Sequence, residues 1–325
     1  MKRGIYNFVF AAAAFALGGC MVGPDYVPPT AEAAKEDLSE KHFYRDEGLW
    51  KEATPAESLP KGDWWKIFND PALDSLLEQC KKNNPSLKAA FYRVEQARQN
   101  ARMDESQLYP QMNGNASFLR TATSKNLTSP YSNYDKWTTG LGMTWDLDLF
   151  GRVMSIIESD IATAQATYDA YNSLILSMQA QVAKTYFSIR QYYSEVDLLV
   201  RTLEVRKEQT KLISDRVKLD FASDLDLQRA IQQEAEAAAQ LAAVRKSIDT
   251  ARNNIAILIG TTPSKLVLDD APLGDVLPKL PDAVPSQLLE RRPDIAAAER
   301  EVYAANARIG AAHAAYFPTV SITAN

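Results

Sequence analysis

Two stretches of the sequence alternate between apolar and polar residues. Apolar residues recur at every second position in residues 112–120 and 137–149, which is the period of a β-strand. The apolar face of the longer stretch comprises Trp137, Thr139, Leu141, Met143, Trp145, Leu147 and Leu149. Its other face comprises Thr138, Gly140, Gly142, Thr144, Asp146 and Asp148. The pattern therefore predicts a strand at each of the two places.

The longer strand has the length and the aromatic residues of a membrane strand. A tilted strand crosses a bilayer with about 9–11 residues. Trp137 and Trp145 lie near the two ends of the apolar face, where membrane barrels carry aromatic girdles. Residues 120–136 are rich in Thr, Ser, Asn and Tyr, as in a long extracellular loop. A sandwich strand with one wet face explains the alternation too, but this loop and the export signal described below favour the membrane strand.

A proline-free stretch from residue 150 to residue 219 has a different period. Its apolar residues recur at alternating steps of four and three, the repeat of a coiled coil. The predicted seam comprises Ile157, Ile161, Ala164, Tyr168, Tyr171, Ile175, Met178, Val182, Thr185, Ile189, Tyr192, Val196, Leu199 and Leu203. About 70 residues at about 1.5 Å each give a helix roughly 105 Å long, which must project from any compact core.

A second helix is predicted to return along the first. Ser223 can cap its start while Asp226 supplies the acid of a capping box, and Gly260 ends it. Its seam comprises Leu227, Ala230, Ala237, Leu241, Val244, Ile248, Ala251, Ile255 and Leu258. Residues 150–259 are therefore predicted to form an antiparallel coiled-coil hairpin with a tight turn near residues 220–222. On periodicity alone, a structural stalk is the simpler interpretation.

Two segments of the chain match at a constant offset of 208 residues. Pro85 and Pro110 correspond to Pro293 and Pro318. At the same offset Ala89 matches Ala297, Ala90 matches Ala298, Val94 matches Val302 and Ala97 matches Ala305. Both prolines and the flanking aromatic residues stay in register, which indicates two copies of one structural unit.

Each copy is predicted to contain a helix followed by a strand. Helix formers make up most of residues 91–109 and 296–316. Each run leads into an aromatic-proline pair, Tyr109-Pro110 or Phe317-Pro318, which stops a helix. Alternation then begins at residue 112 in the first copy and at residue 319 in the second. The sequence therefore predicts a two-fold internal repeat.

The N-terminus has the layout of a secretory signal. Residues 1–19 combine a basic start, an apolar run and two small residues before Cys20. The end of this segment resembles a bacterial lipobox, in which the cysteine receives lipid; the alternative is a short hydrophobic segment that happens to end in cysteine. Met21, rather than aspartate, follows the cysteine, as in lipoproteins sent to the outer membrane. Several acyl chains would anchor the protein stably because each buried methylene contributes about 0.8 kcal/mol.

These patterns divide the chain into five parts. They are a signal peptide at 1–19, a lipidated N-terminal segment and equatorial region at 20–70, the first repeat at 71–260, an equatorial connector at 261–290, and the start of the second repeat at 291–325. The connector is predicted to carry a short strand at 266–268, and Trp64, Trp65 and Phe68 to form an aromatic plug before a helix at Pro71.

Composition excludes several classes of function. The chain has 325 residues, 46% of them apolar, and a net charge of −5, which has the wrong sign for a nucleic-acid binder. Two cysteines make neither a disulfide framework nor a four-ligand zinc site, and Cys80 is expected to be buried. His42 and His313 share no catalytic spacing, and no phosphate loop or nucleophile elbow occurs. We therefore expect no enzyme activity, no metal and no cofactor other than the covalent lipid on Cys20.

Several motifs together resemble one known family. They are Cys20-Met21-Val22-Gly23-Pro24-Asp25-Tyr26, Trp64-Trp65-Lys66-Ile67-Phe68-Asn69-Asp70-Pro71-Ala72-Leu73, Asn84-Pro85-Ser86-Leu87, Trp145-Asp146-Leu147-Asp148-Leu149-Phe150-Gly151-Arg152, Ser223-Asp224-Leu225-Asp226 and Arg291-Arg292-Pro293-Asp294-Ile295. The chain resembles the outer-membrane efflux channels, specifically the TolC-like lipoproteins of the NodT type that serve resistance-nodulation-division pumps. The resemblance runs from the lipobox to the last residue.

The resemblance implies a mainly α-helical homotrimer in the outer membrane. Each subunit would give four strands to a shared twelve-strand barrel and long helical hairpins to an α-barrel tunnel in the periplasm. An inner-membrane pump and a periplasmic adaptor would dock below, and drugs or other small molecules would leave passively. The residues implied for adaptor contact at the hairpin tip are Ser223, Asp224, Leu225 and Asp226. Position 220 is commonly glycine in the family and is aspartate here, which can adopt the left-handed conformation at some cost.

The second repeat is expected to be incomplete in this sequence. Its first strand is cut at Asn325, and the second long hairpin, which carries the gate carboxylates in the family, would lie beyond it. A chain ending there would leave open sheet edges in lipid, so we expect a fragment or a truncated product.

Three alternatives differ in their expected features. A periplasmic adaptor or a coiled-coil structural lipoprotein also pairs a lipid anchor with a hairpin, but an adaptor would need glycine-rich lipoyl-type β segments. A lipid-anchored enzyme would need catalytic motifs that the sequence lacks.

Two acidic residues near the end of the second strand allow two interpretations. Asp146 and Asp148 could line a pore or cap the periplasmic end of the strand.

Overall fold

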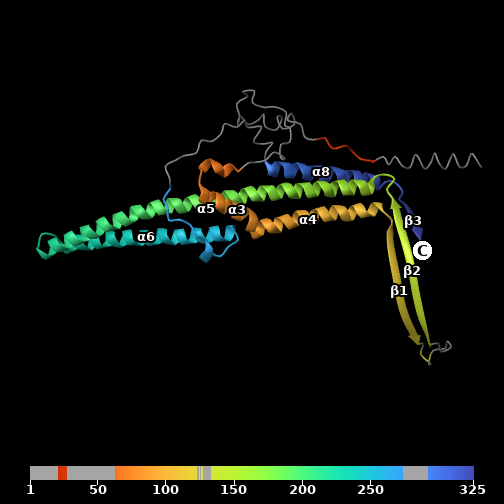
Figure 1. Ribbon diagram of the computed structural model, residues 1–325, viewed down its shortest axis with the longest axis horizontal. Coiled ribbons are helices and arrows are strands. Elements are labelled where there is room, and N and C mark those ends of the chain that lie inside the picture. The colour runs from red at the N-terminus through yellow and green to blue at the C-terminus, as the bar shows by residue number, and fades with distance from the viewer. Residues whose placement is uncertain (1–20, 28–62, 123, 125, 127–132, 274–291) are drawn as a thin grey trace, which may run out of the picture. The chain divides into compact units, whose positions relative to one another are not determined.

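The computed structural model describes residues 21–27, 63–122, 124, 126, 133–273 and 292–325 (Figure 1). The predicted signal peptide, Cys20 and most of the connector lie outside these residues. In chain order the elements are η1 (Trp64–Phe68), α3 (Pro71–Asn83), α4 (Pro85–Glu105), η2 (Ser106–Leu108), β1 (Gln111–Ala122), β2 (Asn133–Leu147), α5 (Arg152–Lys218), α6 (Asp224–Leu258), η3 (Pro263–Lys265), α8 (Pro293–Ala314) and β3 (Val320–Ala324).

The chain divides into two compact units. The first comprises residues 1–54, 92–170 and 293–325, and the second comprises residues 55–91 and 171–292. In the described part of the chain, none of the helices combines the length and the apolar character needed to cross a lipid bilayer.

The first unit contains a three-stranded antiparallel sheet in the order β1-β2-β3. Phe118 lies opposite Trp137, and Trp145 lies opposite Ile322. Because directly opposed residues point to the same side of a sheet, the apolar positions of all three strands fall on one face. Strands lie at the three places in the two repeats where alternation predicted them, and β2 begins four residues before the predicted residue 137.

β2 also ends two residues before the predicted end at residue 149. The Asp148 carboxylate accepts a 2.8 Å hydrogen bond from the main-chain N–H of Met154, in the first turn of α5. Asp148 therefore satisfies one of the free N–H groups at the start of that helix. The alternating pattern extends through Asp148, but this residue caps the start of α5 instead of continuing the strand.

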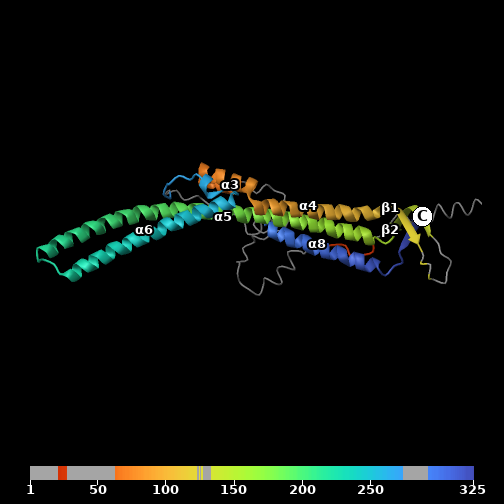
Figure 2. The same ribbon diagram turned by 90° about the horizontal axis from the view of Figure 1, so that it is seen from below.

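In the first unit, α5 lies between α4 and α8 in both views (Figures 1 and 2). Burial on this part of α5 follows two stripes, since one helix covers each side. One stripe includes the predicted seam residues Ile157 and Ala164, and the second consists of small residues, Ser155, Ser159, Ala162 and Ala166. The seam prediction was wrong for Ile161 and Tyr168, which are 41% and 46% exposed because they lie outside both stripes.

Small residues of α8 match the second stripe of α5. Those buried on α8 are Ala304, Ala307, Gly310 and Ala314. A Cβ added to Gly310 would lie 2.9 Å from the Ser155 hydroxyl, and Arg308 Nε donates to the Ser159 hydroxyl at 3.1 Å. The two helices can approach closely because small side chains line both.

The second unit has an apolar core between α3, α5 and α6. Its buried residues are Trp65, Leu73, Leu76, Leu77, Cys80, Val182, Ala183, Tyr186, Ile189, Ala251, Ile255 and Ile259. Trp64 and Phe68 pack against it from η1, as the predicted aromatic plug requires. Cys80 is a fully buried free thiol, as expected. The predicted seam of α6 is confirmed at its buried positions, Ala230, Ala237, Leu241, Ile248, Ala251 and Ile255.

The short strand predicted at residues 266–268 is wrong. This segment follows η3 and pairs with no strand among the described residues. Leu266 and Leu268 pack against the core while Val267 is 88% exposed. The alternation therefore reflects an extended segment lying on helices, whose main-chain groups bind side chains instead of a neighbouring strand.

Candidate functional site

The three strands present a continuous apolar surface. Its residues are Met112, Gly114, Ala116, Phe118, Trp137, Thr139, Leu141, Met143, Trp145, Leu147, Val320, Ile322 and Ala324. Met112, Trp137 and Leu141 are each at least 75% exposed. A contiguous exposed apolar surface of this kind marks contact with a membrane or another protein.

The opposite face of the sheet is polar. Asn113 and Asn115 on β1 lie across from Gly142 and Gly140 on β2. A Cβ at Gly142 would lie 2.5 Å from Asn113 Oδ1, and one at Gly140 would lie 2.6 Å from Asn115 Oδ1. Each glycine therefore makes room for the amide of the neighbouring strand. Asp146 lies on this face, opposite Ser321.

The two tryptophans predicted to form girdles have different surroundings. Trp137 contacts its cross-strand partner Phe118 at a ring distance of 4.7 Å. Trp145 Nε1 donates a 2.9 Å hydrogen bond to the Leu108 carbonyl in η2. An indole with its ring on an apolar face and its N–H bound suits a boundary between apolar and polar surroundings. Trp145 also ties β2 to the helical end that precedes β1.

The segment that follows Cys20 packs on the first unit. The N–H of Val22 donates to the Phe150 carbonyl at 3.4 Å, between β2 and α5. Gly151 there has φ of 72°, and a Cβ on it would lie 2.8 Å from Met21 Cγ. The Phe150 ring stacks on Phe317 at 4.5 Å, directly before β3. The start of the described chain therefore lies where the strands meet the helices.

Residues 23–26 continue along α8. A Cβ on Gly23 would lie 2.7 Å from Gly310 Cα, and Asn306 donates to the Pro24 carbonyl at 3.0 Å. The ring of Tyr26 packs edge-on against Tyr303 at 4.8 Å. Sequence reasoning missed this contact, because the only signal was an isolated glycine inside a helical pattern.

The turn of the hairpin is built by two local motifs. The N–H of Asp220 donates to Val217 at 3.0 Å and that of Phe221 to Arg216 at 2.8 Å, which is a Schellman motif. Asp220 occupies its left-handed position with φ of 56°, as predicted for the residue that replaces glycine.

The predicted capping box starts α6. The Ser223 hydroxyl accepts a 3.2 Å bond from the N–H of Asp226, whose carboxylate accepts from Ser223. These hydrogen bonds from Ser223 lower the pKa of Asp226. Leu219, Phe221 and Leu225 are all at least 60% exposed around this turn. The tip therefore offers a rigid backbone with exposed apolar side chains.

One pair of carboxyl groups in the first unit is electrostatically perturbed. A hydrogen bond with Asp104, then burial, then the charge of Asp104 raise the pKa of Asp160 to about 6, and Arg308 opposes this. Gln107 also donates to the Asp104 carboxylate at 2.6 Å. Among the residues that the structure describes, no group of three or more His, Cys, Asp and Glu residues could hold a metal ion.

Comparison with known proteins finds one family whose sequence model matches most of the chain. The sequence model of the family described as "Outer membrane efflux protein" matches residues 76–261 and 284–325. The solvent efflux pump outer membrane protein SrpC of Pseudomonas putida is 33% identical over 312 residues, which are 95% of this chain and 65% of that protein. The cation efflux system protein CusC of Escherichia coli O6:H1 is 30% identical over 314 residues, again 95% of this chain and 65% of the relative.

Solved structures have the same fold. The outer-membrane channel OprN aligns with a TM-score of 0.72 at 30% identity, covering 94% of this chain and 66% of that one. The open state of the Neisseria gonorrhoeae MtrE outer membrane channel aligns with a TM-score of 0.66 at 28% identity, with the same coverage. The chain thus spans slightly under two thirds of the length of these relatives.

Proposed function

Because the chain belongs to the outer membrane efflux protein family, we propose that it is a channel subunit of a tripartite efflux system. In this role it is a passive exit duct and not an enzyme. The observation that carries the proposal is the two-faced sheet, joined in one chain to a long helical hairpin. The apolar face suits lipid and the polar face suits a water-filled interior, which is the arrangement of membrane strands.

The sheet is proposed to form part of a shared barrel in the outer membrane. An open sheet leaves main-chain N–H and C=O groups of its edge strands without hydrogen-bond partners. Such unpaired groups are not tolerated in lipid, so the edge strands must pair with further strands. A homotrimer with four strands from each subunit meets this need. The repeat supports it, since α4 and α8 begin at Pro85 and Pro293 and a strand follows each helix.

Cys20 is the proposed lipid attachment site. Met21 and Val22 pack at the junction of β2 and α5, so a lipid on the preceding residue would emerge beside the ends of the strands. Trp145 lies at the same end of β2 and would form one girdle, and Trp137 would form the other. No cofactor beyond this lipid is proposed.

The hairpin tip is the proposed contact for a periplasmic adaptor. Ser223, Asp224, Leu225 and Asp226 start α6, where the capping box fixes the backbone and Leu225 is exposed. The adaptor would link the channel to an inner-membrane pump of the resistance-nodulation-division type. An adaptor or a structural stalk is a poorer fit for the chain itself, because neither needs a sheet with an exposed apolar face.

The exported compound is proposed to be a small molecule or ion. The matched relatives are named for solvent, toluene, antibiotic and cation efflux. This range suits a duct that does not select its cargo, whose specificity lies in the pump.

A pair of lysine substitutions tests the membrane function. Leu141 lies on the apolar face at 77% exposure, and Thr138 lies exposed on the polar face. A lysine toward lipid near mid-membrane costs roughly 2–4 kcal/mol, whereas one toward the interior is tolerated. We expect Leu141→Lys to lower the amount of protein in the outer membrane several-fold and Thr138→Lys to leave it near wild type.

The readouts are outer-membrane fractionation and single-channel conductance in planar bilayers. Conductance that changes with Thr138→Lys supports a polar interior. Equal loss in both variants, or full-length wild-type protein that neither enters the outer membrane nor conducts, would refute the channel proposal.

A further inference from the structure

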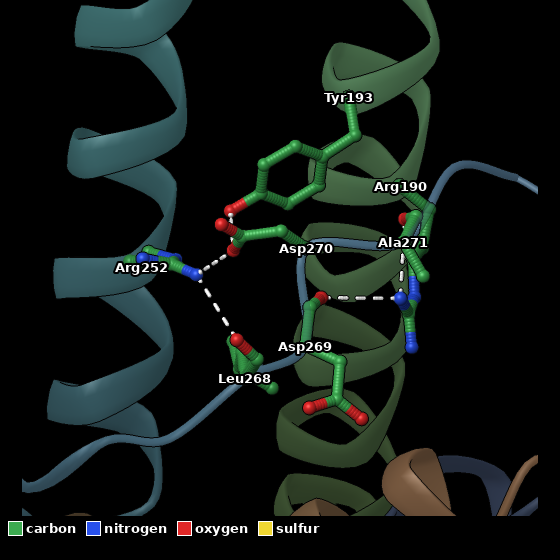
Figure 3. Close-up of polar contacts among 7 residues, drawn as sticks. All are labelled: Arg190, Tyr193, Arg252, Leu268, Asp269, Asp270 and Ala271. Carbon is green, nitrogen blue, oxygen red and sulfur yellow. Dashed lines mark hydrogen bonds and ion pairs between the residues drawn. The ribbon is translucent and has the colours of Figure 1, made fainter.

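An extended segment of the second unit is bound by side chains of both hairpin helices (Figure 3). This latch segment, Leu268–Leu273, follows η3 and belongs to no sheet in the described structure. The side chain of Leu268 packs against the apolar core, and its carbonyl accepts a hydrogen bond from α6. The main-chain groups beyond Leu268 bind α5. A chain without a neighbouring strand must satisfy these groups in another way.

Arg190 on α5 binds two carbonyl groups of the latch segment. Its Nη1 donates to Asp269 at 3.2 Å and to Ala271 at 3.1 Å. Its Nε and Nη2 donate to the Tyr186 hydroxyl at 3.0 and 2.6 Å, and that hydroxyl donates to Asp70. The planar guanidinium of Arg190 therefore binds the segment with one nitrogen, while the Tyr186 hydroxyl fixes its orientation through the other two.

Arg252 on α6 binds the same segment from the other helix. Its Nη2 donates to the Leu268 carbonyl at 3.0 Å and to the Asp270 carboxylate at 2.5 Å. Its guanidinium carbon lies 5.8 Å from the centre of the Tyr193 ring. Its Nε is buried and has no hydrogen-bond partner among the described residues, so the Nη2 contacts fix the position of this side chain.

Asp270 connects the two helices through one oxygen atom. Oδ1 accepts from Arg252 on α6 and from the Tyr193 hydroxyl on α5 at 2.6 Å. Burial and then the hydrogen bond to Asp270 raise the pKa of Tyr193 to about 12, so the phenol remains a donor at neutral pH. A further bond joins the N–H of Leu273 to the Ser194 hydroxyl on α5 at 3.2 Å.

We propose that Arg190, Arg252 and Asp270 form a latch that restrains α5 and α6 from sliding past each other at the base of the hairpin. On α5 the donors to this segment include Arg190 and Tyr193. On α6 the donor is Arg252. If one helix slid past the other by one turn, about 5.4 Å, the segment could keep its hydrogen bonds to one helix only, because its acceptors would lie beyond hydrogen-bond distance of the donors on the other. The apolar seam resists such sliding less specifically, because apolar contacts have no direction.

Amide hydrogen exchange of the full-length chain in detergent or membranes tests the latch. Asp270→Ala removes the shared acceptor. Asp269→Ala is the matched control, since within the described residues Asp269 binds α5 through its main-chain carbonyl and not through its side chain. We expect exchange to rise about tenfold in Asp270→Ala over residues 266–273, and also over residues 190–196 and 250–258 of the two helices. The control should match wild type.

Two results would overturn the proposal. One is equal exchange in Asp270→Ala and Asp269→Ala. The other is a rise confined to residues 266–273, which would make the contacts a loop attachment without effect on the helices. If Asp270→Ala folds poorly, Asp270→Asn can replace it, because the asparagine keeps a neutral acceptor. The latch then requires an exchange rate above that of wild type and less than tenfold higher. Exchange equal to that of wild type in both Asp270→Asn and Arg252→Gln would also contradict the proposal.

Discussion

The side-chain amide of Asn84 donates a 2.7 Å hydrogen bond to the Leu258 carbonyl, joining the start of α4 to the end of α6. Its oxygen accepts from the N–H groups of Ser86 and Leu87 at 2.8 and 3.1 Å, so the same side chain caps α4. Asn84 is only 3% exposed. One buried amide thus satisfies free groups at two helix ends that are far apart in the sequence.

Asn84→Ala should therefore destabilise the second unit. Loss of the cap costs about 1 kcal/mol, and the partly buried Leu258 carbonyl left without a donor costs about 1 kcal/mol more. Urea unfolding of the full chain, followed by circular dichroism, should show a lower midpoint with an unchanged slope. Gln79→Ala is a suitable control, because its hydrogen bond to Ser75 is exposed. A midpoint equal to that of the control would show that the cap and the bridge are energetically unimportant.

Asp220→Gly should stabilise the turn of the hairpin. A non-glycine residue in the left-handed conformation costs roughly 1 kcal/mol, and aspartate somewhat less because its short side chain tolerates that conformation. We expect a gain of about 0.5–1 kcal/mol in thermal or urea unfolding. Asp220→Val should have the opposite sign, since a β-branched residue fits this conformation poorly. Destabilisation by glycine would mean that the Asp220 side chain makes a favourable contact in solution.

The carboxyl pair Asp104 and Asp160 should make stability depend on pH. The folded protein raises the pKa of Asp160 from 3.8 to about 6, so its protonated form is favoured on folding. This contribution is fully present below the unfolded value and is lost as pH rises through about 6. The charges that act on it are Asp104 from α4 and Arg308 from α8.

Asp160→Asn should remove that dependence. Its stability relative to wild type should be greater at pH 7.5 than at pH 5, measured by thermal unfolding in matched buffers. Asp215→Asn is the control, because Lys218 lowers the pKa of Asp215 and the contribution has the opposite sign. A pH profile of Asp160→Asn parallel to that of wild type would contradict the raised pKa of Asp160.

Gly310→Ala should loosen the packing of α8. The new Cβ would lie 2.9 Å from the Ser155 hydroxyl, which is buried and bonded to the Gly151 carbonyl at 2.7 Å, so the helix must shift. A cost of about 1–3 kcal/mol is typical of such overpacking. Gly23→Ala should instead release only residues 21–26, since its Cβ would meet Gly310 Cα.

Limited proteolysis separates these two glycine variants. Cleavage after Tyr26 should rise several-fold in both, whereas a lower unfolding temperature is expected only for Gly310→Ala. Gly114→Ala is the control, because its nearest neighbour, Leu141 Cδ2, lies at an ordinary 3.4 Å. Unchanged cleavage in Gly23→Ala would mean that residues 21–26 are not held through this contact.

The sequence alone determined the elements and the local motifs. Strand alternation, the heptad steps of α6, the left-handed Asp220 and the capping box of Ser223 and Asp226 were all predictable, because each depends on residues within a few positions of one another. The apolar and polar faces of the strands followed for the same reason. The motifs in order also identified the family.

Only the tertiary structure decided which surfaces meet. The second stripe of α5 was invisible because Ser and Ala are neither clearly core nor clearly surface residues, and α8 that covers it comes more than a hundred residues later. Residues 266–268 were predicted to form a strand, but a strand requires a partner, and here Arg252 binds the Leu268 carbonyl instead. The hydrogen bond from Asn84 to the Leu258 carbonyl likewise depends on the fold, which brings the end of α6 beside the start of α4. Sequence patterns report local periods, whereas these contacts depend on groups brought together by the fold.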